Sequence, residues 1–240
     1  MCMTGLLASI CSVEEAAIAL HAGADIIDCK DPSRGALGAL DLDRIAAIVD
    51  YVNGERPVSA TLGDLPPDPK RIQAAVRNTA DCGVDYIKLG LFDEPTAASC
   101  IRALEEECRH NQLIAVCFAD RFDPTPLLPL LSTQGFHGVM IDTAEKQNGR
   151  LTDLWTLDRL GRFVDQAQRL GLVCGLAGRL TLDDIPSLLP LNADYLGFRS
   201  ALCVAGRTSR VDHEAMLRAR DALPLRHDTT TTLTPHRATR

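Results

Sequence analysis

A chain of 240 residues with 46% hydrophobic residues is long enough to bury a large core, as one domain of barrel size or as two smaller domains. The net charge of −7 gives no broad basic surface, which argues against nucleic-acid binding. No apolar run reaches bilayer length, and Glu14 and Glu15 interrupt the apolar start, so we expect neither a membrane protein nor a signal peptide. Nine cysteines without a CxxC pair are typical of reduced thiols, and we expect a cytoplasmic protein.

Short apolar segments recur along the chain, each followed by a loop and an amphipathic stretch. The segments are apolar at nearly every position, which is typical of parallel strands that are covered on both faces. In chain order, the eight predicted strands span residues 5–10, 25–30, 57–63, 86–92, 113–120, 138–144, 172–178 and 195–203.

Signals for helix starts lie between these strands. Ser12 with Glu15 three residues later has the pattern of a capping box, and Thr181 with Asp184 repeats it. A long apolar periodicity predicts one helix over residues 152–170. An acidic residue followed by a proline, which favours the first turn of a helix, occurs at residues 68–69, 94–95 and 123–124.

Eight strands that alternate with helices predict an α/β fold, a single (β/α)₈ TIM barrel over residues 1–223. A doubly wound open sheet is the alternative, although it would be unusual with this many equal units. Residues 224–240 contain six threonines and no apolar periodicity, so we expect a flexible threonine-rich tail outside the barrel.

Charged residues gather where the active site of such a barrel lies, at the carboxyl ends of the strands. Asp28 and Lys30 stand two residues apart at the end of the second strand, so their side chains face the same side. Lys88 lies in the fourth strand, Asp142 ends the sixth, and Lys146 follows in the next loop. We therefore expect three lysines and two aspartates to converge at one mouth.

Two interpretations of these lysines are open. Lys30 and Asp28 could form a structural ion pair while Lys88 extends to solvent. Alternatively the cluster is catalytic, because a desolvated lysine near another cation loses its proton readily and becomes a nucleophile toward carbonyl groups. The convergence of several charges favours the second interpretation, and it predicts Schiff-base chemistry.

A second candidate site follows the last two strands, in "GLAGRL" (175–180) and "GFRS" (197–200). Glycine lets backbone amides approach a ligand, and barrels commonly bind phosphate at these two positions. These glycines could instead only permit tight packing between strand and helix. The residues expected to bind a substrate phosphate are Gly175, Ala177, Gly178, Gly197, Arg199 and Ser200.

Five segments together resemble the family of (5-formylfuran-3-yl)methyl phosphate synthases, also called 4-(hydroxymethyl)-2-furancarboxaldehyde phosphate synthases. The resemblance extends from about residue 5 to residue 210 and is most specific in the first segment. The segments are "DIIDCKDPSRGALGA", "YIKLGLF", "GVMIDTAEKQNGRL", "GLAGRL" and "LGFRSALC".

This resemblance implies a lyase of methanofuran-type cofactor biosynthesis. Such an enzyme condenses two molecules of glyceraldehyde 3-phosphate into a furan aldehyde phosphate and releases phosphate and water. Carried over by motif, Lys30 would be the Schiff-base lysine and Lys88 the proton acceptor. Asp28, Asp142 and Lys146 would be supporting charges in the active site.

Other features of the sequence limit what the resemblance implies. Arg179 stands where the family has a small polar residue, and Ser200 where it has glycine. The six histidines show no ligand-like spacing, and we expect neither a metal nor a cofactor. The expected binding partner is a small-molecule substrate, a triose phosphate. The sequence does not determine the oligomeric state, and a homo-oligomer is one possibility. A class I aldolase or an isomerase of another small sugar phosphate is the main alternative, with a non-catalytic phospholigand sensor as a third.

Overall fold

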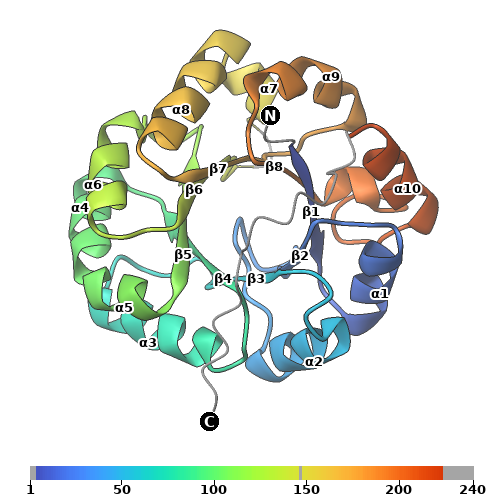
Figure 1. Cartoon of the computed structure of the whole chain (residues 1–240), viewed down its shortest axis with the longest axis horizontal. Coiled ribbons are helices and arrows are strands. Elements are labelled where there is room, and N and C mark those ends of the chain that lie inside the picture. The colour runs from blue at the N-terminus through green and yellow to red at the C-terminus, as the bar shows by residue number, and fades with distance from the viewer. Residues whose placement is uncertain (1–3, 146–147, 224–240) are drawn as a thin grey trace.

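The computed structural model describes residues 4–145 and 148–223, and within these ranges eight parallel strands close into a barrel (Figure 1). Each strand pairs with the next in chain order, and the last pairs with the first. The predicted (β/α)₈ barrel is confirmed. The strands are β1 (Gly5–Ile10), β2 (Ile26–Cys29), β3 (Val58–Thr61), β4 (Tyr86–Leu91), β5 (Gln112–Phe118), β6 (Gly138–Asp142), β7 (Val173–Leu176) and β8 (Tyr195–Phe198).

Helices form a ring around the strands (Figure 1). Both α4 and α5 follow β4, and both α7 and α8 follow β6, so each of these pairs fills the place of one barrel helix. The α-helices are α1 (Val13–His21), α2 (Leu42–Val52), α3 (Pro69–Ala80), α4 (Glu94–Ala103), α5 (Glu105–His110), α6 (Leu128–Thr133), α7 (Leu151–Leu154), α8 (Leu157–Arg169), α9 (Ile185–Leu188) and α10 (His213–Asp221). The 3₁₀ turns are η1 (Thr125–Leu127), η2 (Leu182–Asp184), η3 (Leu189–Leu191) and η4 (Ser200–Leu202).

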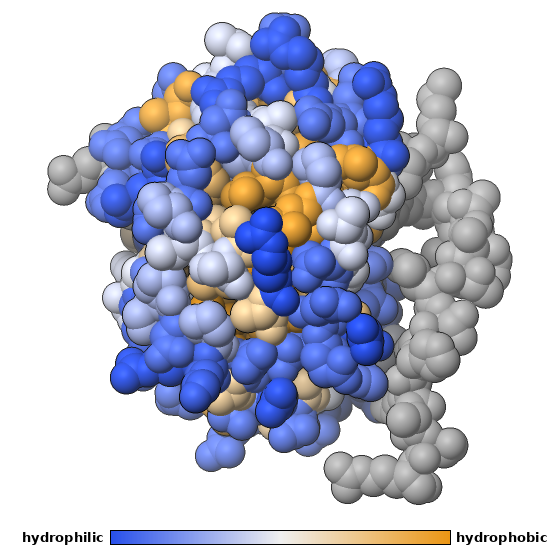
Figure 2. Space-filling view, turned by 90° about the vertical axis from the view of Figure 1, so that its left-hand side faces the viewer, coloured by the Kyte–Doolittle hydropathy of each residue, from blue (hydrophilic) through white to orange (hydrophobic). Residues whose placement is uncertain are grey.

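The side of this ring that Figure 2 shows is mostly polar. Figure 2 shows one side of the ring as largely hydrophilic, with a few hydrophobic residues near its middle. Single exposed apolar side chains are ordinary on a folded domain. Among the described residues, no helix has the length and apolar character needed to cross a bilayer.

The helix-start signals near the N-terminus act as expected in part. Ser12 Oγ accepts a hydrogen bond from the Glu15 backbone N–H at 3.3 Å and caps α1. The Glu15 carboxylate accepts from the Cys11 N–H, so the reciprocal bond of a capping box to Ser12 is replaced. Asp68 caps α3 by accepting from the Lys70 N–H at 3.0 Å.

The single helix predicted over residues 152–170 is wrong, because the segment forms two helices. Trp155 is extended (φ −119°, ψ 134°) and separates α7 from α8. Its side chain is buried, and its indole N–H donates to the Ala119 carbonyl at 3.2 Å. Thr156 then caps α8 by accepting from the Arg159 N–H at 3.3 Å. Apolar periodicity continues across the break, which is why the sequence suggested one helix.

Two boundaries differ in the last third of the chain. Thr181 and Asp184 form the predicted reciprocal cap, but they open the 3₁₀ turn η2, which leads into α9. The strand predicted over residues 195–203 ends at Phe198. It ends there because Arg199 leaves the extended conformation (ψ −63°) and its carbonyl begins the turn η4. The predicted tail, residues 224–240, lies outside the described residues.

The core has two layers that follow the alternation of side chains along each strand. In β1, Leu6, Ala8 and Ile10 face the helices, whereas Leu7 packs in the smaller cluster inside the barrel. Ser9 follows Leu7 on the inner side, at the carboxyl end of the strand. Polar residues on the inner side of neighbouring strands therefore mark the position of the site.

Candidate active site

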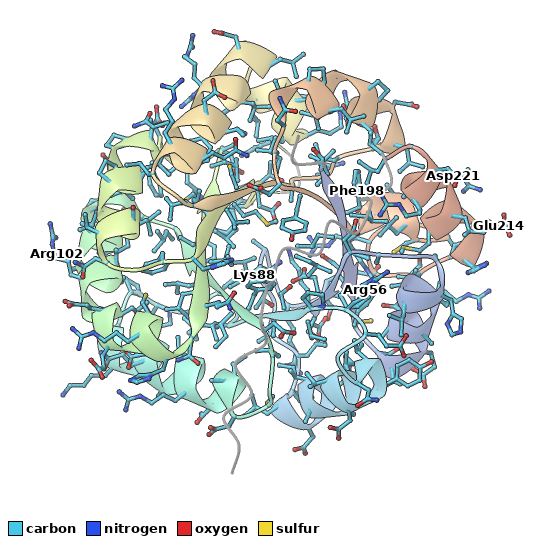
Figure 3. The ribbon with its side chains drawn as sticks, in the orientation of Figure 1. Arg56, Lys88, Arg102, Phe198, Glu214 and Asp221 are labelled. Atoms are coloured by element: carbon cyan, nitrogen blue, oxygen red, sulfur yellow. The ribbon has the colours of Figure 1, made fainter. Side chains whose placement is uncertain are left out.

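An ion pair between Lys88 and Asp28 lies inside the barrel, with 2.5 Å between Nζ and Oδ1. Lys88 is 3% exposed and Asp28 is 0% exposed, and Figure 3 shows Lys88 close to the barrel axis. Ser9 and Ser59 donate hydrogen bonds to the two oxygens of the Asp28 carboxylate at 2.7 and 2.6 Å. The pairing of β1, β2 and β3 produces this arrangement, because Ser9, Asp28 and Ser59 are direct neighbours across the strands.

The environment shifts the pKa of both members of this pair. Burial would raise the pKa of Asp28, but the Lys88 ammonium and the Ser59 hydroxyl outweigh burial and hold that pKa below its ordinary value. Burial lowers the pKa of Lys88, with a smaller lowering from Lys30 and an opposing effect of Asp28. Asp28 thus stays ionised, and Lys88 releases its proton more readily than an exposed lysine.

A second ion pair joins Lys30, directly after β2, to Asp142 at the end of β6, with 3.3 Å between Nζ and Oδ2. The other oxygen of Asp142 accepts from the Thr143 N–H at 2.7 Å. The alternative in which Lys30 pairs with Asp28 and Lys88 extends to solvent is therefore wrong. Each lysine has a carboxylate of its own.

Both lysines line one cavity at the carboxyl ends of the strands, here called the mouth cavity. Lys88 is part of its wall together with Ser9 on β1. Figure 3 shows the difference in position between Lys88 and a surface residue such as Arg102, which lies at the outer rim of the molecule. The full lining is Leu7, Ser9, Lys30, Pro32, Lys88, Met140, Asp142, Ala177, Gly178, Arg179, Leu180, Gly197, Phe198, Arg199, Ser200 and Arg207. This is the face on which barrel enzymes carry their catalytic residues.

Five of the six residues predicted to bind phosphate are part of this wall: Ala177, Gly178, Gly197, Arg199 and Ser200. Gly178 has φ +107°, and a Cβ there would lie 2.8 Å from the Thr143 side chain, so only glycine lets the backbone pass so closely. Gly175 does not reach the mouth cavity. It lies on β7, two residues before Ala177, and faces the inside of the barrel. There it lines a deeper apolar cavity, where a Cβ would meet Met140 at 2.7 Å.

Arg199 also lines the mouth cavity, but its guanidinium is engaged by protein groups. It binds the Glu15 carboxylate with N···O distances of 2.6 and 3.2 Å. It also donates to the carbonyls of Ser9, Arg207 and Ser209 at 3.2, 2.8 and 2.8 Å. These bonds hold the loop after β8 to the barrel, and the phosphate contact of Arg199 stays a prediction.

Contacts in the loop after β2 explain several residues of the segment "KDPSRGALGA" (30–39). The Asp64 carboxylate accepts from the N–H groups of Ala36 and Leu37 at 3.0 and 2.8 Å. Gly35 has φ +96°, and a Cβ there would collide with that carboxylate. Asp64 and Gly35 thus fix the shape of the loop that leads away from Lys30.

Several site residues escaped the sequence analysis. Ser9 and Ser59 are hydroxyl residues within apolar strands, and that interruption was the available signal. Asp64 and Arg207 lie in loops and carry no comparable signal. Lys146 lies outside the described residues. Among the described residues, no group of three or more His, Cys, Asp or Glu side chains is arranged to hold a metal ion.

The sequence model of the 4-HFC-P synthase family matches residues 6–220. The chain belongs to this family. A protein of Methylorubrum extorquens is 41% identical over 219 residues, which cover 91% of both chains. Two proteins named (5-formylfuran-3-yl)methyl phosphate synthase, from Methanopyrus kandleri and Methanocaldococcus jannaschii, are 36% and 35% identical. These matches cover 85% and 87% of this chain and 92% and 95% of theirs, and they confirm the resemblance.

Solved structures with the same barrel include 3-hexulose-6-phosphate synthase, with a TM-score of 0.66 and 16% identity over 92% of this chain and 100% of that one. Phosphoribosyl anthranilate isomerase from Thermus thermophilus gives a TM-score of 0.62 and 15% identity over 90% and 97%. At such low identity, these likenesses show the fold alone.

Proposed function

We propose that this chain condenses two molecules of glyceraldehyde 3-phosphate into 4-(hydroxymethyl)-2-furancarboxaldehyde phosphate, with release of phosphate and water, as a carbon–oxygen lyase of methanofuran-type cofactor biosynthesis. Membership of the 4-HFC-P synthase family supports the reaction. The observation that carries the proposal is the position of Lys30 and Lys88, each beside a carboxylate, in the wall of one cavity.

The reaction begins with a Schiff base. Nζ of Lys30 attacks the carbonyl carbon of one triose phosphate, and loss of water gives an iminium ion. Lys30 must first lose its ammonium proton, and the Asp142 carboxylate at 3.3 Å is placed to accept it. The iminium withdraws electrons from the adjacent carbon and makes its C–H group acidic.

Lys88 then acts as the base. Because burial lowers the pKa of Lys88, its neutral form is more accessible than that of an exposed lysine, and it can remove the proton from the acidic carbon. The resulting enamine attacks the aldehyde carbon of the second triose phosphate. Proton transfers by Asp142 or Lys146 then assist ring closure, dehydration and loss of phosphate, and cleavage of the C–N bond to Lys30 frees the product and restores the lysine. Asp28 holds Lys88 in position throughout.

One phosphate group is expected beside the loops after β7 and β8. Gly178 and Gly197 have no side chain to fill this part of the mouth cavity, and Ser200 adds a hydroxyl. Backbone amides there can approach an anion closely. We therefore expect these loops to bind the phosphate of the triose that is attached to Lys30.

The test is to incubate the purified protein with glyceraldehyde 3-phosphate and to measure furan absorbance and free phosphate together. The proposal predicts that both appear at equal rates. A class I aldolase would give an open-chain sugar phosphate with neither signal, and an isomerase would give only an isomeric triose phosphate; either result would overturn the proposal. Lys88→Ala should still form the covalent adduct but should produce no furan.

A further inference from the structure

A second cavity adjoins the mouth cavity and shares Pro32 and Arg207 with it. We call it the outer cavity. Its remaining wall comes from the loops after β2, β3, β5 and β6 and from Phe92, directly after β4. Its volume is about 430 Å³, compared with about 50 Å³ for the mouth cavity. The outer cavity is thus within the size range of ligand sites, and it meets the mouth cavity at Pro32 and Arg207.

The acidic groups of the outer cavity are already neutralised or hydrogen-bonded. The Asp64 carboxylate accepts two backbone N–H bonds from the loop after β2. The Glu145 carboxylate pairs with Arg121, with 2.6 Å between oxygen and nitrogen. These groups therefore oppose the entry of an anion less than two free carboxylates would.

Arg207 is the cation at the boundary between the two cavities. Its guanidinium donates to the Gly35 carbonyl at 3.0 Å, and among the described residues no carboxylate lies within ion-pair distance of it. Burial lowers its pKa, with Asp142 and Asp64 acting in the opposite direction from farther away. A half-buried guanidinium keeps its charge, so without an anion it carries an uncompensated desolvation cost.

The protein holds Arg207 firmly in this position. Arg199 donates to the backbone carbonyls of Arg207 and Ser209, and Glu15 anchors Arg199 from α1. Glu15 also accepts from the Val211 N–H at 3.0 Å. The loop after β8 is therefore tied to the barrel at several points, and Arg207 is preorganised for a ligand.

We propose that the outer cavity binds the phosphate group of the second triose phosphate, with Arg207 as its ligand. This inference rests on the proposed function, which requires two triose phosphates at once. Carbon–carbon bond formation needs the reacting atoms about 3–3.5 Å apart, so the second substrate must occupy a space that adjoins the first. A guanidinium between two dianionic phosphates reduces their repulsion, and it can bind phosphate oxygens in a bidentate manner.

The experiment compares the wild type with Arg207→Gln and with a matched control, Arg210→Gln, which removes an exposed arginine from the same loop. The Michaelis constant for furan formation should rise roughly ten- to hundredfold in Arg207→Gln, the range expected for a lost hydrogen-bonded charge contact. Arg210→Gln should behave as wild type. Borohydride should still trap the first triose on Lys30 in Arg207→Gln, because Lys30 and the glycine loops after β7 and β8 are unchanged.

Calorimetric titration with inorganic phosphate tests the site without any turnover. The wild type should bind two phosphate ions and Arg207→Gln one, with Arg207→Lys retaining weaker binding at the second site. One phosphate in all variants, or an unchanged Michaelis constant in a folded Arg207→Gln, would overturn the inference. A third result separates the two proposals. If the wild type makes no furan but binds two phosphate ions, and Arg207→Gln binds only one, the proposed function fails while the outer anion site stands.

Discussion

Asp28 on β2 and Lys88 on β4 meet across the intervening strand β3, with 2.5 Å between their charged atoms and no appreciable solvent contact. The pair lies one inward-facing position below Lys30, because Asp28 precedes Lys30 by two residues. Lys30 in turn pairs with Asp142. Two lysines and two aspartates thus form two stacked ion pairs.

The first prediction concerns the pH dependence of catalysis. Asp28→Asn removes the negative charge that stabilises the protonated form of Lys88, so the pKa of Lys88 should fall further. The proposed mechanism needs neutral Lys88, and the acidic limb of the profile of kcat/KM against pH should therefore move to lower pH. A limb that stays in place or moves to higher pH would show that Lys88 is not the titrating base.

A second prediction concerns the ion pair that anchors the loop after β8. Glu15→Gln breaks a buried pair with Arg199 and should lower the free energy of unfolding by about 3 kcal/mol. It should also raise the Michaelis constant, since the loop that carries Arg207 loses its anchor. Glu14→Gln changes the exposed neighbour and serves as the control in denaturant titrations. Equal stability of the two variants would contradict the anchoring role.

Gly35 provides a third prediction, with Gly54 as its control. Both have positive φ, +96° and +77°, but a Cβ at Gly35 would collide with the Asp64 carboxylate, whereas nothing lies within 4 Å of one at Gly54. Gly54→Ala should cost about 1 kcal/mol of stability and leave turnover unchanged. Gly35→Ala should displace the loop after β2 and lower kcat/KM at least about tenfold, because small displacements of groups in an active site have effects of this size. Similar kinetics for the two variants would show that this loop does not shape the site.

His137 links stability to pH. Burial lowers its pKa, with Asp194 acting weakly in the opposite direction, so the folded chain binds a proton less readily than the unfolded chain. Its contribution is present above the unfolded pKa of about 6.5 and is lost as pH falls toward the folded value. His137→Phe keeps the ring contact with Tyr86 and should lose less stability between about pH 7 and pH 5. Thermal unfolding at both pH values measures this, and identical losses would rule it out.

The positions of the charged residues could be predicted from the sequence, but their pairing could not. Alternation along the strands places Asp28 and Lys30 on the same side, and the barrel places Lys88 and Asp142 at the same mouth. The partner of each lysine depends on register, since β2, β3 and β4 together set the height of Lys88 relative to Asp28. No local pattern contains that information.

Arg199 shows the same limit more sharply. Its position after β8 suggested a phosphate ligand, but its partner Glu15 is 184 residues away in the chain and comes near only because β8 pairs with β1. Closure of the barrel thus gives Arg199 an anchoring contact that no local pattern reveals. Arg207, eight residues later, lines both cavities, but no strand or glycine pattern in the sequence indicates this.

The most direct test of the account is to add borohydride to the protein during turnover of glyceraldehyde 3-phosphate and to locate the mass increment by peptide. The account predicts a reduced triose adduct on Lys30, none on Lys88, and none at all in Lys30→Arg, which keeps the charge beside Asp142 but cannot form the iminium. An active enzyme without an adduct, or with the adduct on Lys88, would contradict the assignment of Lys30 as the nucleophile.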